Sequence, residues 1–299
     1  MDVLQAGRGL VESPRWHAGR LWYSDWTAGE IVAVDDSGAA EVMARHESLP
    51  LCFDFSPDGR LVVVSASRRA LLTPSADGEL DTYADLAALS QLGFNDIVID
   101  GRGNAYVNSP DFDFAVGPPQ SAVQPGFVAL VRPDGTSRVV AEDIAFPNGM
   151  AVTPDNATLI VADSYRHQLV GFDIGADGGL SGRRVWADLG DAAPDGICLD
   201  AEGACWYADV PHERCVRVAE GGEVLQTMPL DRGGFACMLG GTSLYVVAAR
   251  WPGAAALREH TNWDGQVLRT RVAVPGAGWP GGAAPAPPAD QPPSASTRL

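Results

Sequence analysis

One short pattern, a tight turn followed by an apolar strand, occurs six times along this chain of 299 residues. The copies read "HAGRLWYSDW", "SPDGRLVVVS", "DGRGNAYVNS", "TPDNATLIVADS", "DAEGACWYADV" and "LGGTSLYVVAA". In every copy the residue before the strand is glycine or asparagine, which accept the positive φ that a hairpin turn requires. These turn residues are Gly19, Gly59, Gly103, Asn156, Gly203 and Gly241, separated by 40, 44, 53, 47 and 38 residues.

Each unit also contains further strand signals, such as "EIVAVDDSGAAEVMA" in the first and "GFVALVRPDGTSRVVAED" in the third. Four short strands in a repeat of about 40–50 residues are typical of one propeller blade. We therefore expect an all-β fold, a six-bladed β-propeller with four antiparallel strands per blade, over residues 1–274. A solenoid would also repeat, but it needs polar caps at both ends, and neither end supplies one. Residues 275–299 are rich in Pro, Ala and Gly, which predicts a disordered tail.

Charge and cysteine content limit the partners and the compartment. The formal net charge of −17 disfavours nucleic acid and anionic membranes, whose phosphates would be repelled. No apolar run reaches the roughly 20 residues that span a bilayer, and the N-terminus shows no signal-peptide pattern. The five cysteines include no CxxC pair, which indicates reduced thiols and a cytoplasmic protein. The expected partner is a small molecule, and the sequence leaves the oligomeric state open.

The repeat register places polar residues at one position in several blades. Eight residues before the turn residue, three copies carry an amide or a carboxylate, namely Asn95, Asn148 and Asp195. The first copy carries Glu12 at seven residues, whereas the remaining two have Leu51 and Gly233 at eight. Equivalent positions in a propeller repeat around the central axis, so these oxygens should converge on one end of the tunnel.

Converging carboxylate and amide oxygens predict a metal site. Two buried carboxylates repel each other, and a divalent cation relieves that cost. The donors are all oxygen, so the ion should be hard, with calcium favoured and magnesium, manganese or zinc as alternatives. Three protein ligands leave coordination positions for water and substrate, as in a catalytic site. The competing interpretation is that these "NG" and "DG" pairs only form turns.

The motifs that carry these residues resemble those of a known family. "ESPRW", "FNDIVIDGRGNAYV", "FPNGMAVTPDNATLIVADS", "PDGICLDAEGACWYADV" and "FACMLGG" together resemble the gluconolactonase, regucalcin (senescence marker protein) and luciferin-regenerating enzyme family. The resemblance implies a lactonase, or more broadly a carboxylic-ester hydrolase. It implies a single divalent ion held by Glu12, Asn148 and Asp195, with Asn95 contacting the substrate or a water molecule.

The resemblance also suggests roles in catalysis and in substrate binding. Asp195 is the favoured general base, and Asn95 would orient the attacking water. Sugar-lactone hydrolases of the family often carry an arginine where this chain has Gly93, so a bulkier or more apolar ester is a candidate substrate. Trp16 follows Glu12 closely enough to border the cavity. The alternatives are a non-catalytic calcium-binding or ligand-binding propeller and a phosphotriesterase-like hydrolase.

Overall fold

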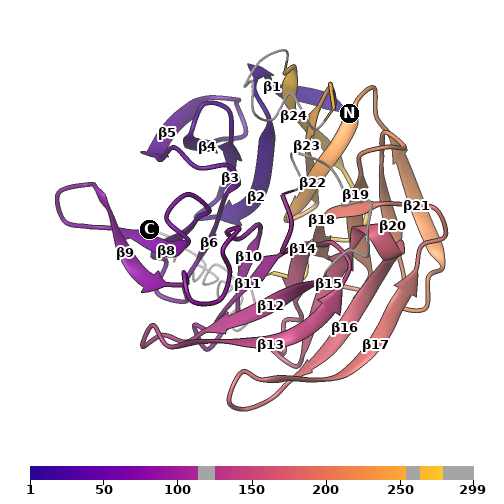
Figure 1. Cartoon of the computed structure of the whole chain (residues 1–299). Coiled ribbons are helices and arrows are strands. Elements are labelled where there is room, and N and C mark those ends of the chain that lie inside the picture. The colour runs from indigo at the N-terminus through magenta and orange to yellow at the C-terminus, as the bar shows by residue number, and fades with distance from the viewer. Residues whose placement is uncertain (114–124, 254–262, 279–299) are drawn as a thin grey trace, which may run out of the picture.

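A computed structural model of the protein describes residues 1–113, 125–253 and 263–278. In this part of the chain, strands β1 to β24 form six four-stranded sheets, which follow one another as blades around a central axis (Figure 1). The predicted six-bladed propeller is confirmed. Within the same residues no helix is long and apolar enough to cross a membrane.

The blades share one plan, in which the first strand lies nearest the axis and the fourth lies at the rim. The first strands are β2 (Val11–His17), β6 (Leu51–Phe55), β10 (Ile97–Ile99), β14 (Pro147–Val152), β18 (Pro194–Leu199) and β22 (Gly233–Gly240). The second strands are β3 (Arg20–Asp25), β7 (Leu61–Ser65), β11 (Ala105–Ser109), β15 (Thr158–Asp163), β19 (Cys205–Asp209) and β23 (Ser243–Ala249). The third strands are β4 (Glu30–Val34), β8 (Ala70–Pro74), β12 (Gly126–Val131), β16 (Gln168–Ile174), β20 (Arg214–Val218) and β24 (Gly265–Arg271). The fourth strands are β5 (Ala40–Arg45), β9 (Leu80–Asp85), β13 (Ser137–Ile144), β17 (Leu180–Asp188), β21 (Val224–Pro229) and β1 (Asp2–Arg8).

The predicted turn residues join the first and second strands of their blades. All six have positive φ, including Asn156 at 58° and Gly103 at 83°. Glycine has no β-carbon to strain this conformation, and asparagine adopts it more readily than other residues, so both suit these turns. The repeat register read from these turns therefore matches the positions of the first strands.

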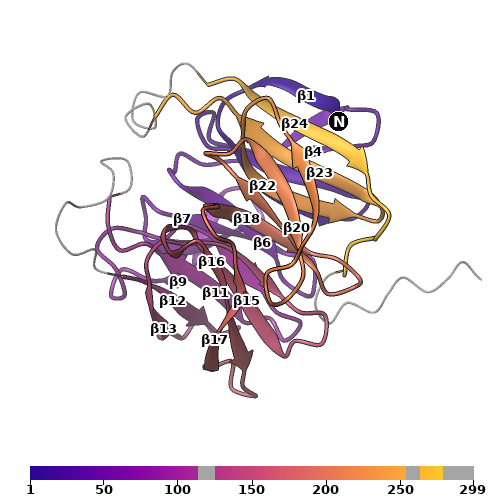
Figure 2. The ribbon, with the colours of Figure 1, turned by 90° about the vertical axis from the view of Figure 1, so that its right-hand side faces the viewer.

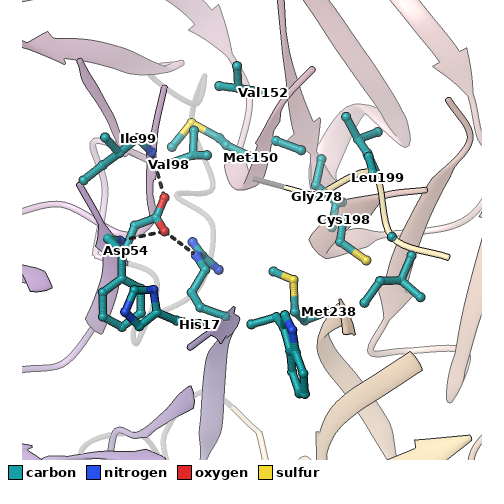
Figure 3. Close-up of a pocket in the computed structure, with 18 of the residues that line it drawn as sticks. His17, Asp54, Val98, Ile99, Met150, Val152, Cys198, Leu199, Met238 and Gly278 are labelled. Atoms are coloured by element: carbon teal, nitrogen blue, oxygen red, sulfur yellow. Dashed lines mark hydrogen bonds and ion pairs between the residues drawn. The ribbon is translucent and has the colours of Figure 1, made fainter. Parts of the chain in front are cut away.

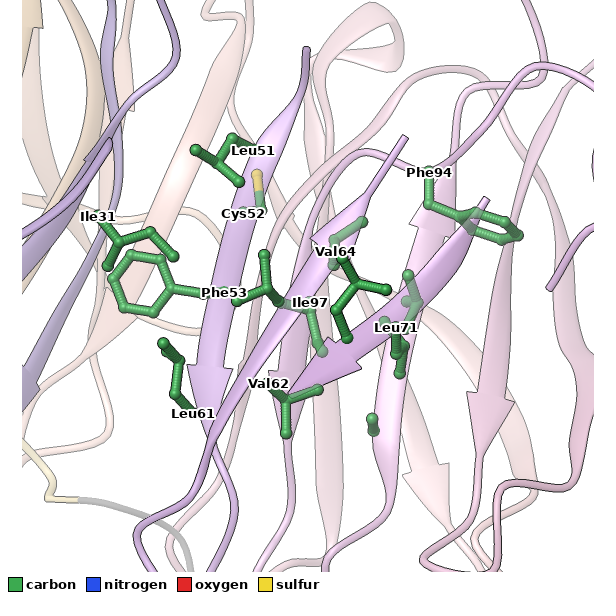
Figure 4. Packing of buried hydrophobic residues seen from close by; sticks show 14 of the residues in the cluster. Ile31, Leu51, Cys52, Phe53, Leu61, Val62, Val64, Leu71, Phe94 and Ile97 are labelled. Atoms are coloured by element: carbon green, nitrogen blue, oxygen red, sulfur yellow. The ribbon is translucent and has the colours of Figure 1, made fainter. Parts of the chain in front are cut away.

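The hydrophobic core lies between neighbouring blades and is densest near the axis. All five residues of β6 are buried, whereas most residues of the rim strands β5 and β21 are exposed. In Figure 4, Phe53 of β6 lies beside Ile31 of the preceding blade, and Ile97 lies on the other side of β6. Packing of the apolar first strands against one another thus fixes the relative positions of their ends.

The last blade is completed by the start of the chain. Strand β1 pairs antiparallel with β24, with Asp2 opposite Arg269 and Arg8 opposite Gly265. Figure 2 shows these two strands, one from each end of the propeller sequence, side by side. The repeats predict four strands per blade, but they do not indicate that the N-terminus supplies this one.

The first four residues of the expected tail are bound to the propeller. The Gly276 N–H donates to the carbonyl of Gly241 at 2.9 Å, and the Ala277 N–H donates to the carbonyl of Leu199 at 3.0 Å. Both acceptors lie where first strands end, so this segment covers the end of the axis opposite the predicted site. Residues 279–299, the rest of the expected tail, lie outside the described residues.

Candidate active site

The predicted site residues come together at one end of the axis. Glu12, Asn148 and Asp195 are each the second residue of a first strand, and Asn95 lies two residues before β10. Because the first strands pack against one another around the axis, these positions face the same space. Leu51 and Gly233 begin the other two first strands.

A small polar cavity lies between these strands. Glu12, Asn95 and Asn148 line it, together with Asp96 and Arg15. Its volume is about 10 Å³, which is near the minimum that a single water molecule needs. The cavity is therefore the size of a single water molecule or ion.

Hydrogen bonds connect the amides of the cavity to Asp195. The Asn95 Nδ2 group donates to Asn148 Oδ1 at 3.3 Å, and the Asn148 amide donates to the Asp195 carboxylate. Asn148 also contacts the hydroxyl of Ser164, with Nδ2 to Oγ at 3.4 Å. Its backbone carbonyl accepts a bond of 2.6 Å from Nδ2 of Asn108. Hydrogen bonds thus hold both the side chain and the backbone of Asn148 in place.

Burial and mutual repulsion raise the pKa values of two carboxyl groups in this site, those of Glu12 and Asp195. Burial raises the pKa of Glu12 to about 8, and repulsion from Asp96 adds to this, while the Ser13 N–H and Arg15 oppose it. Burial, followed by repulsion from Glu12 and Asp96, raises the pKa of Asp195 well above its ordinary value. A buried carboxylate, Glu12, and a partly buried one, Asp195, disfavour each other's charge, and a bound cation stabilises such an arrangement.

The donor set fits a hard cation. Glu12 and Asp195 carry carboxylate oxygens and Asn148 carries an amide oxygen, the ligand types that calcium and magnesium take. In the described ranges no three His, Cys, Asp or Glu side chains gather as a metal-binding group. The predicted set contains only two such residues, so its third ligand has to be the amide.

An ion pair that the sequence reasoning missed forms one wall of the cavity. The Arg15 guanidinium lies 3.4 Å from Asp54 and 3.3 Å from Asp96, measured from nitrogen to carboxylate oxygen. It also donates to the carbonyl of Ile97 at 2.6 Å. Arg15 and Asp96 fall inside the motifs "ESPRW" and "FND", so the signal was present, but only the structure shows that they meet.

A second missed feature is an aspartate at the end of the second strand in three blades. The carboxylate accepts a backbone N–H from the residues that lead into the first strand of the same blade. The pairs are Asp25 with Gly9 (2.9 Å), Asp163 with Phe146 (3.1 Å) and Asp209 with Ala193 (3.2 Å). These are the three blades that carry Glu12, Asn148 and Asp195. The signal in the sequence was the recurring aspartate of "YSDW", "VADS" and "YADV".

The structure does not place the other two predicted substrate-binding residues, Trp16 and Gly93, in the polar cavity. Trp16 does not line the polar cavity; it stacks on Tyr245 with ring centroids 5.5 Å apart and lines a larger cavity farther along the axis. Gly93 is buried with φ at 89°, and a β-carbon there would lie 3.1 Å from the carbonyl oxygen of Ala66. Position 93 therefore requires glycine for conformational reasons.

Two aromatic clusters lie at the same end of the axis as the polar cavity. Phe146 precedes β14 and contacts Tyr165 and Phe112, with ring centroids 4.8 and 5.5 Å apart. The other cluster contains Phe235, near the start of β22, with Trp251 and Trp263. Tyr165 and Trp251 are exposed. Both clusters sit where second strands end and first strands begin, which places them around the predicted site.

Comparisons with known proteins point to one family. The model of the SMP-30/gluconolactonase/LRE-like region matches residues 10–250. A 6-deoxy-6-sulfogluconolactonase of Pseudomonas putida is 27% identical over 285 residues, which cover 91% of this chain and 94% of that protein.

Solved structures agree with the fold. A gluconolactonase from Xanthomonas campestris superimposes with a TM-score of 0.71 at 23% identity, covering 90% of this chain and 89% of the other. A calcium-binding regucalcin from Agrobacterium tumefaciens gives a TM-score of 0.71 at 21% identity, covering 93% and 95%.

Proposed function

This chain belongs to the SMP-30/gluconolactonase/LRE-like family, and from that premise we propose that it is a metal-dependent hydrolase of lactones or related esters. The observation that carries the proposal is the ion-sized cavity lined by Glu12 and Asn148, with Asp195 bonded to Asn148. The relative from Pseudomonas putida, a lactonase, aligns with most of this chain and supports the reaction class.

We assign one divalent cation, calcium by preference, to Glu12, Asn148 and Asp195. When bound, such an ion polarises a carbonyl group and makes a water molecule more acidic. The amide of Asn95 holds Asn148 Oδ1 in place, and it is near enough to orient a water molecule or a substrate oxygen. Arg15 keeps Asp96 paired, so that Asp96 stays beside the site without becoming its base.

Asp195 is assigned the proton transfer. In the hydrolysis, the water oxygen bonds to the lactone carbonyl carbon and the water proton passes to Asp195. The ring C–O bond then breaks, and the departing oxygen takes the proton from Asp195, which gives the hydroxy acid and returns Asp195 to its carboxylate form. Asp195 would lie beside the ion that it shares with Glu12 and Asn148, where a carboxylate can accept a proton from the attacking water as a general base.

The aromatic clusters favour a substrate with an apolar portion. Tyr165 and Trp251 expose ring surface near the site, and such surface binds apolar groups better than hydroxyl groups. Gly93 offers no side-chain donor to a polyhydroxylated ring. We therefore place lactones and aryl esters with an apolar substituent ahead of sugar lactones.

The five cysteines are buried and free, which favours a reducing compartment such as the cytoplasm.

A second candidate function is calcium binding without catalysis, because the regucalcin that shares this fold is described as a calcium-binding protein. A phosphotriesterase-like activity is a third.

One screen separates these functions. Purified protein is incubated with sugar lactones, alkyl-substituted lactones, aryl esters and an organophosphate triester, in chelator and again after calcium or manganese is restored. We expect lactone or ester hydrolysis that disappears with chelator and returns with metal. Metal binding without turnover on any substrate would support the calcium-binding candidate. Turnover of the organophosphate alone would support the phosphotriesterase.

A further inference from the structure

A second, larger cavity of about 360 Å³ lies at the opposite end of the axis, and we call it the apolar chamber (Figure 3). Its walls are formed where the first strands end. They include His17, Phe55, Val152 and Leu199, the last residues of β2, β6, β14 and β18. The candidate active site, by contrast, lies where these strands begin.

The apolar chamber is separate from the candidate active site. Glu12 and His17 lie five positions apart on β2, which corresponds to at most about 16 Å, because the strand bulges between Glu12 and Arg15. Arg15 and Ile197 line both cavities and therefore form the partition between them. Arg15 is fixed in that partition by its ion pairs with Asp54 and Asp96.

The lining of the chamber is mainly aliphatic and sulfur-containing. Figure 3 shows Val98, Ile99, Met150, Val152, Leu199 and Met238 around the space. A cavity lined in this way holds water poorly and binds apolar molecules. Its volume lies within the range of small-molecule sites, about 300–1,000 Å³.

The polar groups of the chamber limit the charge of a ligand. Among the described lining residues the full charges belong to Arg15 and Asp54, and these two pair with each other. The chamber therefore presents no spare cation to an anionic headgroup. His17, stacked on Phe55 with ring centroids 3.7 Å apart, and Ser56 supply hydrogen-bonding groups at one side.

The C-terminal segment completes the wall. Gly276, Ala277 and Gly278 line the chamber, and the backbone of Gly276 and Ala277 is hydrogen-bonded to the ends of the neighbouring first strands. The chamber is thus built from the ends of the first strands of all six blades and from one segment that follows the propeller.

We propose that the apolar chamber is a binding site for a neutral, mainly apolar small molecule with one hydrogen-bonding group. A fused two-ring aromatic compound has the appropriate size. This site is distinct from the proposed lactone site, and its ligand need not be a substrate.

The test uses the full chain and the neutral fluorophore 6-propionyl-2-(dimethylamino)naphthalene, whose emission shifts to shorter wavelength in apolar surroundings. Ala151 and Ala277 line the chamber, so Ala151→Phe and Ala277→Phe each place a phenyl group inside it. Each should weaken dye binding by about tenfold or more, a loss of roughly 1.4 kcal/mol or more. Ala40→Phe, on the exposed rim strand β5, is the matched control and should bind like the wild type. An anionic naphthalene sulfonate of similar size should bind at least about tenfold more weakly than the neutral dye, because Asp54 lines the chamber and no described residue lines it with an unpaired cation.

Four results would overturn the proposal. The first is no emission shift with folded wild-type protein, and the second is binding that neither phenylalanine variant weakens. The third is equal affinity for the neutral and anionic dyes. The fourth is dye binding only after the chain is cut following Gly278, which would show that the protein's own C-terminal residues fill the chamber. Melting temperatures near the wild-type value establish that the variants are folded, and Ala277→Phe at the edge of the chamber serves if Ala151→Phe does not fold. Dye binding is measured independently of hydrolysis, so a protein that hydrolyses no lactone would still test this proposal.

Discussion

The carboxylate of Asp163 accepts a hydrogen bond of 3.1 Å from the backbone N–H of Phe146, two residues before Asn148. Asp25 and Asp209 make the same kind of contact in the blades of the other two proposed ligands. An outer carboxylate thus fixes the backbone that carries each proposed ligand. Groups of this kind, which orient ligands without binding the ion, affect metal affinity in many proteins.

Replacing Asp163 by alanine should therefore weaken metal binding. We expect an apparent calcium affinity about 10–100-fold lower, the usual effect of losing a group that orients a metal ligand. Ser65→Ala is the matched control, because Ser65 ends the second strand of a blade whose first strand begins with Leu51. Calorimetric metal titrations of both variants, alongside their melting temperatures, give the comparison. Equal metal affinity in Asp163→Ala and Ser65→Ala would show that Asp163 has no positioning role.

Calcium should raise the melting temperature of the wild-type protein. A ligand that binds only the folded state at 100 times its Kd adds about 2.7 kcal/mol of stability. Glu12→Gln removes one carboxylate from the site, so higher calcium concentrations should be needed for the same rise. Glu41→Gln, on the exposed strand β5, is the control. Melting curves in chelator and in calcium provide the measurement, and a wild-type curve that calcium leaves unchanged would argue against the site.

The amino-acid pattern predicted the blades, their register and the position of Asn95, Asn148 and Asp195, because turn residues with positive φ recur at fixed distances from the first strands. It did not predict the pairing of β1 with β24, since that contact joins the two ends of the propeller sequence. Contacts between residues far apart in the chain, such as Arg15 with Asp96, leave no periodic signal. Trp16 was expected near the candidate active site because it is four residues from Glu12. Along a strand, however, a few residues cover a large part of the length of the axis, and Trp16 lies toward the other cavity.

The first residues of the expected disordered tail, Pro275 to Gly278, should contribute to stability. A chain ending at Gly278 should melt like the full-length protein, because it keeps the hydrogen bonds from Gly276 and Ala277. A chain ending at Val274 loses them and should melt several degrees lower, since about 1 kcal/mol shifts the melting temperature by roughly 2–4 °C in a protein of this size class. Calorimetry of the two truncated chains tests this. Identical melting temperatures would show that the segment adds nothing to the propeller.

Position 93 should tolerate no side chain without loss of stability. Gly93→Ala should cost more than about 1–2 kcal/mol, the strain of a left-handed conformation, because its β-carbon would also lie 3.1 Å from the Ala66 carbonyl oxygen. Gly203→Ala is the control, since Gly203 has φ at 79° and open space at the β-carbon position. Chemical denaturation of both variants compares them. A smaller loss for Gly93→Ala than for Gly203→Ala would contradict the assigned conformation.

The central claim, that Asp195 serves both as metal ligand and as base, is tested most directly by the hydrolysis rate of Asp195→Asn at saturating metal. The substrate is whichever lactone or ester the wild-type protein turns over in the screen, and Asp81→Asn, exposed on β9, controls for loss of a surface charge. We predict that kcat/KM for Asp195→Asn falls by at least about 10²-fold, the low end for removal of a general base, while Asp81→Asn keeps the wild-type rate. Full activity of Asp195→Asn at saturating metal would contradict the account.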